Sequence, residues 1–218
     1  MHQLPKLALF TRHPHCSLQC CNGVIEALSG RYRFMLFNEG QCEGNTLDGV
    51  DMVIFPGGVG DSESYHRFFK DRRRAKFVAE YVRRGGRYLG ICMGAYWAGR
   101  EYFNLLQNAD AVQYITRPNT DTRRPHPKAI KINWLGEDHK MYFYDGCAIA
   151  GDPTEFQTIA TYANGDPMAI IQNRIGLIGC HPESQAFWYQ SHSWMHKHYH
   201  NGVHHQLLQN FVDTLMQR

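Results

Sequence analysis

The stretch GRYLGICMGAYWAG, residues Gly86–Gly99, places a single cysteine between two glycines directly after an apolar run. RYLGI has the character of a buried strand, and GAYWAGREYF after it has helical character. Cys92 therefore falls on a strand-to-helix turn, in the pattern Gly-x-Cys-x-Gly. A nucleophile on so sharp a turn needs glycine neighbours, because larger side chains would collide with the strand or block the substrate. The pattern predicts a reactive cysteine; the alternative is tight packing around an inert buried thiol.

The segments on either side of this turn indicate an α/β fold. Strands are expected at residues 7–11, 31–37, 50–55 and 87–91, and helices at residues 22–30, 62–69 and 74–86 between them. Such alternation is typical of a parallel sheet with right-handed crossovers. Five further strands, expected at 129–135, 140–150, 156–163, 168–172 and 174–180, are separated by turns, and a helix is expected at 204–216. We therefore predict a flavodoxin-like doubly wound, mostly parallel sheet with an antiparallel extension, in one domain over residues 1–218.

The composition of the chain argues against nucleic acid and membrane as binding partners. The formal net charge of +3 is too small to indicate nucleic-acid binding, and no apolar run is long enough to cross a membrane. The N-terminal residues do not resemble a signal peptide. The seven cysteines have no regular spacing, which indicates reduced thiols. We expect a cytoplasmic protein that binds neither nucleic acid nor membrane.

Two other strand ends offer partners for Cys92. The last predicted strand runs into HPES, which contains His181 and Glu183. The strand at 50–55 ends at Gly57 and Gly58. The carboxyl ends of parallel strands meet at one edge of a sheet, so these residues should gather there. His181 could accept the Cys92 proton while Glu183 orients the imidazole, and the Gly57–Gly58 turn could supply an oxyanion donor.

The order and spacing of VIFPGG, YLGICMGAYWAG and IGLIGCHPES resemble the class I glutamine amidotransferase-like superfamily. FVAEYVRRGG and ESYHRFF bring the resemblance closer to the biotin–protein ligase N-terminal domain family. The resemblance implies a triad of Cys92, His181 and Glu183, with the amides of Gly58 and Met93 as the oxyanion hole. It does not imply biotin ligation, because the chain is too short for a ligase domain and has no biotinyl-adenylate loop.

Tyr96 departs from the superfamily pattern. Glutamine-hydrolysing members usually carry a glutamine four residues after the nucleophile, and this chain has Tyr96 there. A phenol cannot make the same contacts as an amide, which argues against glutamine as the substrate. The chain also has no synthetase domain to accept ammonia, so an acceptor would have to be a separate protein.

A second group of chemically active residues follows the first strand: His13, His15, Cys16, Cys20 and Cys21. Their spacing matches no standard zinc motif, so we expect no metal site and no cofactor. By topology the segment should reach the same sheet edge as Cys92. Candidate pocket residues are Gly57, Tyr65, Tyr96 and Cys16. The histidine-rich segment at residues 192–205 is expected to be a solvated surface.

Three functions follow from these residues. The leading one is a cysteine-dependent hydrolase or amidotransferase that cleaves a C–N bond of a small amide through a thioester. The alternative is a non-catalytic or regulatory module that keeps the triad and binds a ligand or a protein partner. A third is a redox sensor that pairs Cys92 with Cys16 or Cys20.

Overall fold

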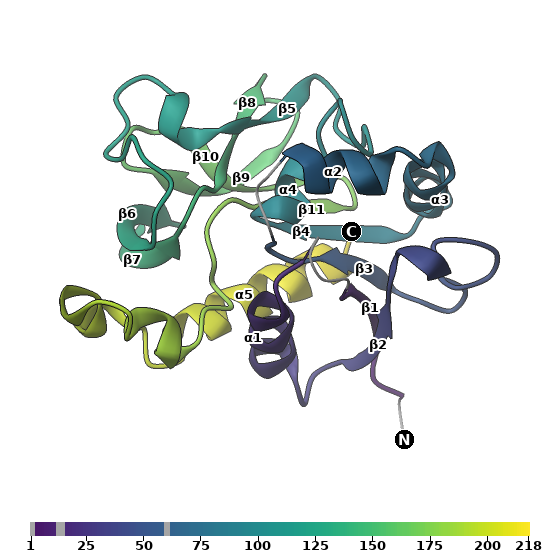
Figure 1. The fold of residues 1–218 in the computed structure, drawn as a ribbon, viewed down its shortest axis with the longest axis horizontal. Helices are drawn as coiled ribbons and strands as arrows, with labels where there is room; N and C mark the ends of the chain where they lie inside the picture. Colours follow the sequence, from purple (N-terminus) through teal and green to yellow (C-terminus); the bar gives the residue numbers. More distant parts are fainter. Residues whose placement is uncertain (1–2, 12–15, 59–61) are drawn as a thin grey trace.

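The structure is a computed structural model that describes residues 3–11, 16–58 and 62–218. Within these residues nine strands form one sheet, in the order β2-β1-β3-β4-β11-β10-β9-β6-β7 (Figure 1). The parallel strands are β2 (Arg33–Phe37), β1 (Lys6–Phe10), β3 (Met52–Phe55), β4 (Arg87–Ile91) and β11 (Ile175–Ile178). The antiparallel extension consists of β10 (Pro167–Gln172), β9 (Gln157–Tyr162), β6 (Lys128–Trp134) and β7 (Glu137–Phe143). The predicted fold class is confirmed.

A second, smaller sheet pairs β5 (Ala109–Gln113) with β8 (Cys147–Gly151) in antiparallel register. Helices cover both faces of the large sheet (Figure 1). One face carries α1 (Leu18–Leu28) and α5 (Val203–Met216), and the other carries α2 (Ser62–Phe69), α3 (Arg72–Arg83) and α4 (Met93–Trp97). Short 3-10 segments lie at Glu39–Gln41, Tyr114–Thr116, Ala186–Tyr189 and Ser193–His198. No described helix is both long and apolar enough to span a bilayer.

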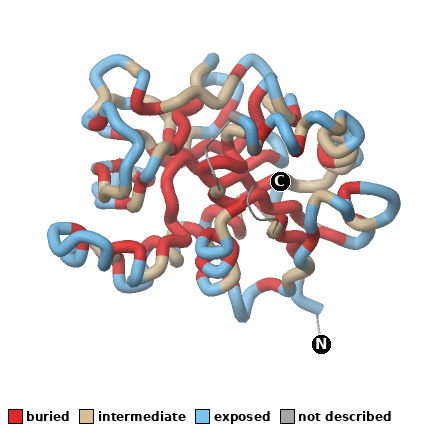
Figure 2. The backbone as a smooth tube through the Cα atoms, in the orientation of Figure 1, coloured by how far each residue is buried: buried red, intermediate tan, exposed pale blue. Residues whose placement is uncertain are grey.

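The core beneath α2 and α4 is aromatic. The rings of Phe10 and Phe55, on adjacent strands, stack with centroids 4.9 Å apart. Phe68 and Trp97 pack above them with ring centroids 4.7 Å apart. All four side chains are fully buried. The central strands of the sheet are red in Figure 2. This burial fixes α4 on the sheet, with Trp97 in the core.

Two predicted elements differ from the structure. The helix after Cys92 is much shorter than expected, because the chain turns at Gly99 and Phe103 N–H donates back to the Trp97 carbonyl. The predicted strand at residues 140–150 is interrupted at Gly146. A Cβ at Gly146 would lie 2.0 Å from the Gly179 carbonyl oxygen, so the backbones meet too closely there for any side chain. The part after the interruption is β8, whose partner β5 was not predicted.

The histidine-rich segment is only partly a solvated surface, so that expectation was wrong for two residues. His200 and His204 are buried; His200 contacts the loop after β11, and His204 packs against His139 of β7 and against His200. His200 Nε2 lies 2.8 Å from the Ser184 carbonyl oxygen, and His205 Nε2 lies 3.2 Å from the same oxygen. Neutral imidazoles can donate one hydrogen bond from within an apolar layer, so buried histidines of this kind are structural.

Candidate active site

Cys92 occupies the strained turn between β4 and α4. Its φ is +49° and its ψ is −102°, a conformation that non-glycine residues rarely adopt. Cys92 N–H donates to the Ile178 carbonyl at 2.8 Å, which ties the turn to β11. A Cβ at Gly90 would lie 2.4 Å from the Gly94 carbonyl oxygen, and one at Gly94 would lie 1.8 Å from the Phe55 carbonyl oxygen. Both flanking glycines are therefore required by close approach of the backbone.

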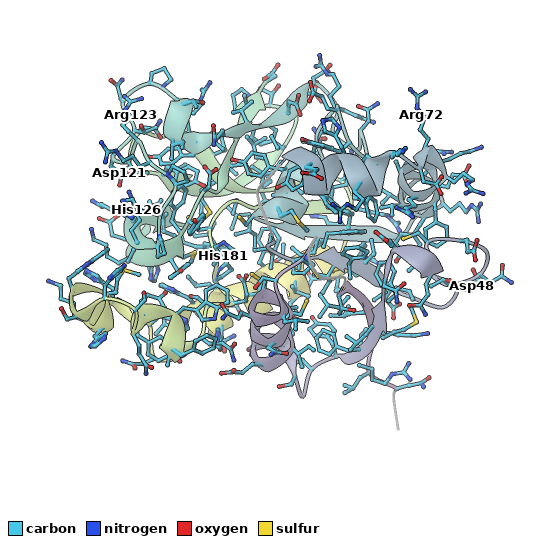
Figure 3. All side chains as sticks on the ribbon, in the orientation of Figure 1. Asp48, Arg72, Asp121, Arg123, His126 and His181 are labelled. Carbon is cyan, nitrogen blue, oxygen red and sulfur yellow. The ribbon has the colours of Figure 1, made fainter. Side chains whose placement is uncertain are left out.

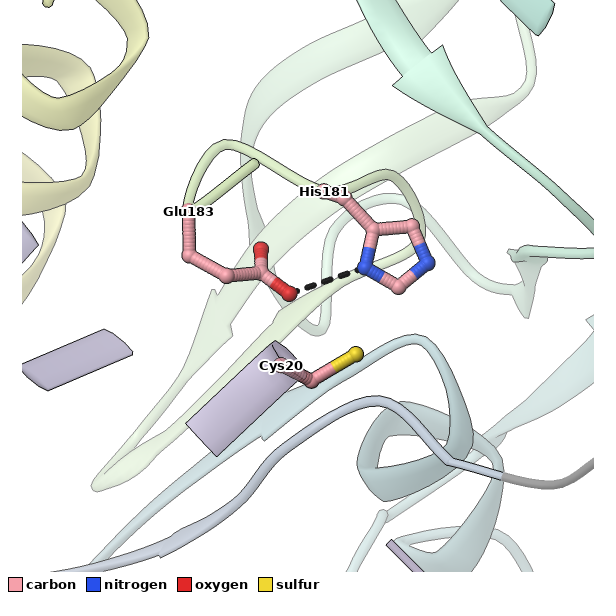
Figure 4. Close-up of side chains that lie close together, drawn as sticks. All are labelled: Cys20, His181 and Glu183. Atoms are coloured by element: carbon pink, nitrogen blue, oxygen red, sulfur yellow. Dashed lines mark hydrogen bonds and ion pairs between the residues drawn. The ribbon is translucent and has the colours of Figure 1, made fainter. Parts of the chain in front are cut away.

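His181 and Glu183 lie on the turn that follows β11. His181 Nδ1 is 2.8 Å from Glu183 Oε1, and both side chains are buried (Figure 4). An imidazole that donates from Nδ1 to a carboxylate keeps Nε2 as a proton acceptor. Helix α1 packs directly on this turn, since a Cβ at Gly23 would lie 2.3 Å from the Glu183 carbonyl oxygen.

The surroundings of His181 favour its charged form. Burial lowers the pKa of His181, but the negative charge of Glu183 and the interaction with Cys92 raise it by more. The net result is a pKa well above the usual range for histidine. The rings of Tyr142 and Trp188 pack edge-on against the imidazole, with centroids 5.8 Å and 5.5 Å away. The imidazole is thus fixed in orientation and can hold a proton.

Cys20, on α1, is the unexpected neighbour of His181. Ligand atoms of Cys20, His181 and Glu183 all lie within 4.8 Å of one another. Figure 4 draws these three side chains together. Burial raises the pKa of Cys20 to about 11, although contact with His181 lowers it. The three side chains could hold a metal ion such as zinc, but the ion would compete with the bond between His181 and Glu183. Without an ion, Cys20 is a protonated thiol beside the imidazole.

The two other described cysteines of the cluster, Cys16 and Cys21, contact each other. Cys16 Sγ lies 3.7 Å from Cys21 Sγ, and both thiols donate to the Phe10 carbonyl at 3.4 Å and 3.5 Å. His13 and His15 lie outside the described residues. The cluster that the sequence suggested therefore divides into a buried pair, Cys16 and Cys21, and a single thiol beside His181.

A cavity of about 640 Å³ opens beside Cys92. Five of the predicted site residues line it with Cys92: His181, Met93, Gly58, Tyr65 and Tyr96. Cys16 and Gly57 are not among its lining residues. Gly57 instead makes room for the imidazole, because a Cβ there would lie 2.7 Å from His181 Cε1. In Figure 3, His181 lies near the centre of the molecule, between the helices and the small sheet.

Cys20 also lines the cavity, as the topology predicts for its segment. The sequence analysis missed the other lining residues, which are Tyr102, Gln113, Tyr142, Tyr144, Asp145, Trp188, Ser17, Gln19 and Pro125. Tyr142 and Tyr144 are two residues apart in a predicted strand, which places them on one face and was a usable signal. Gln113 and Asp145 carried no such signal, because the β5–β8 pairing that joins them was not predicted.

Comparison with known proteins agrees with this architecture. Residues 15–113 match the family described as biotin-protein ligase, N terminal; the match includes Cys20 and Cys92 and ends before His181. No curated protein matches the sequence. A glutamine amidotransferase from Thermotoga maritima superposes with a TM-score of 0.69 at 12% identity, covering 100% of both chains.

Two further solved structures have the same fold. A protein from Thermoplasma acidophilum, described as a putative subunit of GMP synthase, gives a TM-score of 0.65 at 16% identity, covering 100% of this chain and 96% of that one. PurLQS from Thermotoga maritima gives 0.66 at 14% identity, covering 98% and 100%. The resemblance stated from the sequence is confirmed: the fold is that of glutamine amidotransferases, with an N-terminal segment similar to the biotin-protein ligase family.

Proposed function

We propose that this chain, which combines a biotin-protein ligase N-terminal segment with the glutamine amidotransferase fold, is a cysteine-dependent hydrolase or amidotransferase of small amides. One observation carries the proposal. Cys92, held at a φ of +49°, lines the same cavity as an imidazole whose Nδ1 is 2.8 Å from a buried carboxylate. Strained backbone at a reactive side chain and a base oriented by a third group are both features of covalent catalysis.

The reaction would proceed in two steps. Before the attack His181 Nε2 has taken the proton of the Cys92 thiol; Cys92 Sγ then attacks the amide carbon, and the amine leaves with that proton when the C–N bond breaks. The product of this step is a thioester. Water then loses a proton to His181 and attacks the thioester carbon, which releases the carboxylic acid and restores the thiol. Glu183 holds the imidazole in the required tautomer throughout.

The oxyanion of each tetrahedral intermediate would be stabilised by the N–H groups of Met93 and Gly58. Both residues line the cavity with Cys92. Met93 follows the nucleophile directly in the chain, and Gly58 comes from the end of β3. Donors from two elements that line the cavity with the attacking sulfur suit an oxygen that gains charge during attack.

The substrate is proposed to be an amide other than glutamine, because Tyr96 occupies the position after the elbow where the superfamily carries glutamine. One similar structure is described as part of a GMP synthase, which supports a separate protein as the acceptor of released ammonia. The irregular spacing of the seven cysteines supports a reducing compartment, such as the cytoplasm.

The test is the rate at which iodoacetamide alkylates Cys92, measured across pH with the labelled residue identified by mass spectrometry. We expect Cys92 to react about tenfold faster at pH 7 than a free thiol, because the neighbouring imidazole of His181 accepts the thiol proton. His181→Ala should abolish the difference. His196→Ala removes an exposed histidine and should leave the rate unchanged.

The second candidate, a ligand-binding module without turnover, is favoured by Tyr96. Tyr96 lines the cavity, and its buried hydroxyl has no hydrogen-bond partner among the described residues. The same labelling experiment separates the two functions. A Cys92 that reacts no faster than a free thiol, and is unaffected by His181→Ala, supports the binding module and contradicts catalysis.

A further inference from the structure

We infer that the cavity beside Cys92 selects small amides that carry a positive charge, and that Asp145 is the residue that recognises this charge. The inference deepens the proposed function by naming its substrate class, and it rests on that function for the role of Cys92. Three features of the described cavity carry it: a carboxylate without a described ion-pair partner, the absence of lysine and arginine from the described lining, and a wall of aromatic rings.

Asp145 lies on the turn between β7 and β8, partly exposed to the cavity. Gln113 Nε2 donates to both of its carboxylate oxygens, at 3.1 Å and 2.9 Å. The small sheet brings the two together, since Gln113 pairs with Cys147 at the end of β5. Among the described residues no lysine, arginine or histidine forms an ion pair with Asp145. A neutral amide orients this carboxylate but does not compensate its charge.

The other described lining residues do not supply the missing charge. The chain has 23 lysines and arginines, yet none of them is among the described lining residues. His181 is another titratable lining group, and Glu183 already balances its charge at 2.8 Å. The Asp145 side chain is partly buried, which raises the pKa of its carboxyl, and a neighbouring cation would favour the ionised form.

Aromatic side chains complete the wall: Tyr65, Tyr96, Tyr102, Tyr142, Tyr144 and Trp188. The faces of such rings attract ammonium and guanidinium groups, most strongly where water is excluded. Tyr65 and Tyr102 meet edge-on with centroids 5.5 Å apart, so their faces point in different directions. A carboxylate and several ring faces around one cavity suit an alkylammonium or guanidinium group.

The charge preference can be measured without turnover. We would compare the rates at which Cys92 reacts with two methanethiosulfonates of similar size, one bearing a trimethylammonium group and one bearing a sulfonate. Each rate is divided by the rate for free 2-mercaptoethanol, and mass spectrometry separates labelling of Cys92 from that of Cys20. We expect the normalised ratio of cationic to anionic rates to exceed one. Asp145→Asn should lower this ratio about tenfold, the effect of one unit charge acting on reagents of opposite sign near a protein surface.

Two further variants make the test specific. Asp48→Asn removes the same charge from an exposed site that does not line the cavity and lies away from His181 in Figure 3, so the ratio should not change. Gln113→Lys places a cation against Asp145 and should lower the ratio as Asp145→Asn does. If either cavity variant folds poorly by circular dichroism, the other still decides the question.

The substrate class is then tested with three matched amides: 4-aminobutyramide, pentanamide and glutaramate, whose ends are cationic, neutral and anionic. Ammonia release should be fastest from 4-aminobutyramide. A ratio that favours the anionic reagent, or that is unchanged by both cavity variants, overturns the inference while fast alkylation of Cys92 still supports catalysis. Slow alkylation with an Asp145-dependent ratio has the opposite meaning: the cation site stands and the proposed catalysis fails.

Discussion

Substitution of Gly94 by alanine would test why the elbow has its sequence. The added Cβ would lie 1.8 Å from the Phe55 carbonyl oxygen and 2.6 Å from the Phe55 carbonyl carbon, whereas ordinary contacts begin at 3.4 Å. Both atoms belong to the backbone of β3, in the buried centre of the sheet, so no side chain can rotate away. Relief requires α4 to move by roughly 1.5 Å from the strand that it covers, which is a severe case of overpacking.

We expect Gly94→Ala to lower the free energy of unfolding by about 3 kcal/mol, at the upper end of measured overpacking costs. Urea denaturation followed by circular dichroism measures this value. Gly40→Ala is the matched control, because its Cβ would meet only the end of the Asn38 side chain, at 3.2 Å. We expect that control to change stability by less than about 1 kcal/mol. A Gly94→Ala protein that unfolds at the wild-type urea concentration, with Cys92 alkylated at the wild-type rate, would refute the close-approach argument.

Two more predictions follow from the buried histidines. Glu183→Gln should lower the pKa of His181, because the carboxylate opposes the effect of burial; ¹⁵N NMR of labelled histidine measures the shift, and an unchanged titration contradicts it. Burial lowers the pKa of His200 to about 4 and that of His204 to about 3. As the pH falls, these two histidines are therefore protonated in the unfolded chain at a higher pH than in the folded protein. The free energy of unfolding should fall by about 1.4 kcal/mol per pH unit for each histidine between about pH 6.5 and pH 4. His204→Leu should reduce this slope in urea titrations, and an identical slope would show that His204 is not involved.

The parts of the molecule that the sequence predicts best are those where one short segment determines the geometry. The elbow at Cys92 is such a segment, because Gly90 and Gly94 are required by contacts within a few residues and with the neighbouring strand. The His181–Glu183 turn is another, since its two side chains are only two residues apart. The catalytic roles given to these residues stay predictions until Cys92 is tested directly.

The parts that were missed depend on contacts between distant segments. Asp145 and Gln113 are 32 residues apart, and their pairing needs both the interruption at Gly146 and an unpredicted strand. The burial of His200 depends on the Ser184 carbonyl in another loop. Residue patterns predict which face of an element is apolar, but they do not predict which distant segment will pack against that face. The contact between Gln113 and Asp145 and the burial of His200 and His204 could therefore be found only from the structure.

The two sheets give the cavity walls separate structural origins. The turns that carry Cys92 and His181 are anchored on the large sheet, while Asp145 and Gln113 depend on the small sheet formed by β5 and β8. Mutations in the small sheet can therefore change which molecule is admitted without breaking a hydrogen bond of the proposed triad. Over evolutionary time such a division would let related chains acquire new substrates through substitutions in the β5–β8 sheet alone. Residues of that sheet could likewise be randomised in the laboratory while the turns that carry Cys92 and His181 keep their sequence.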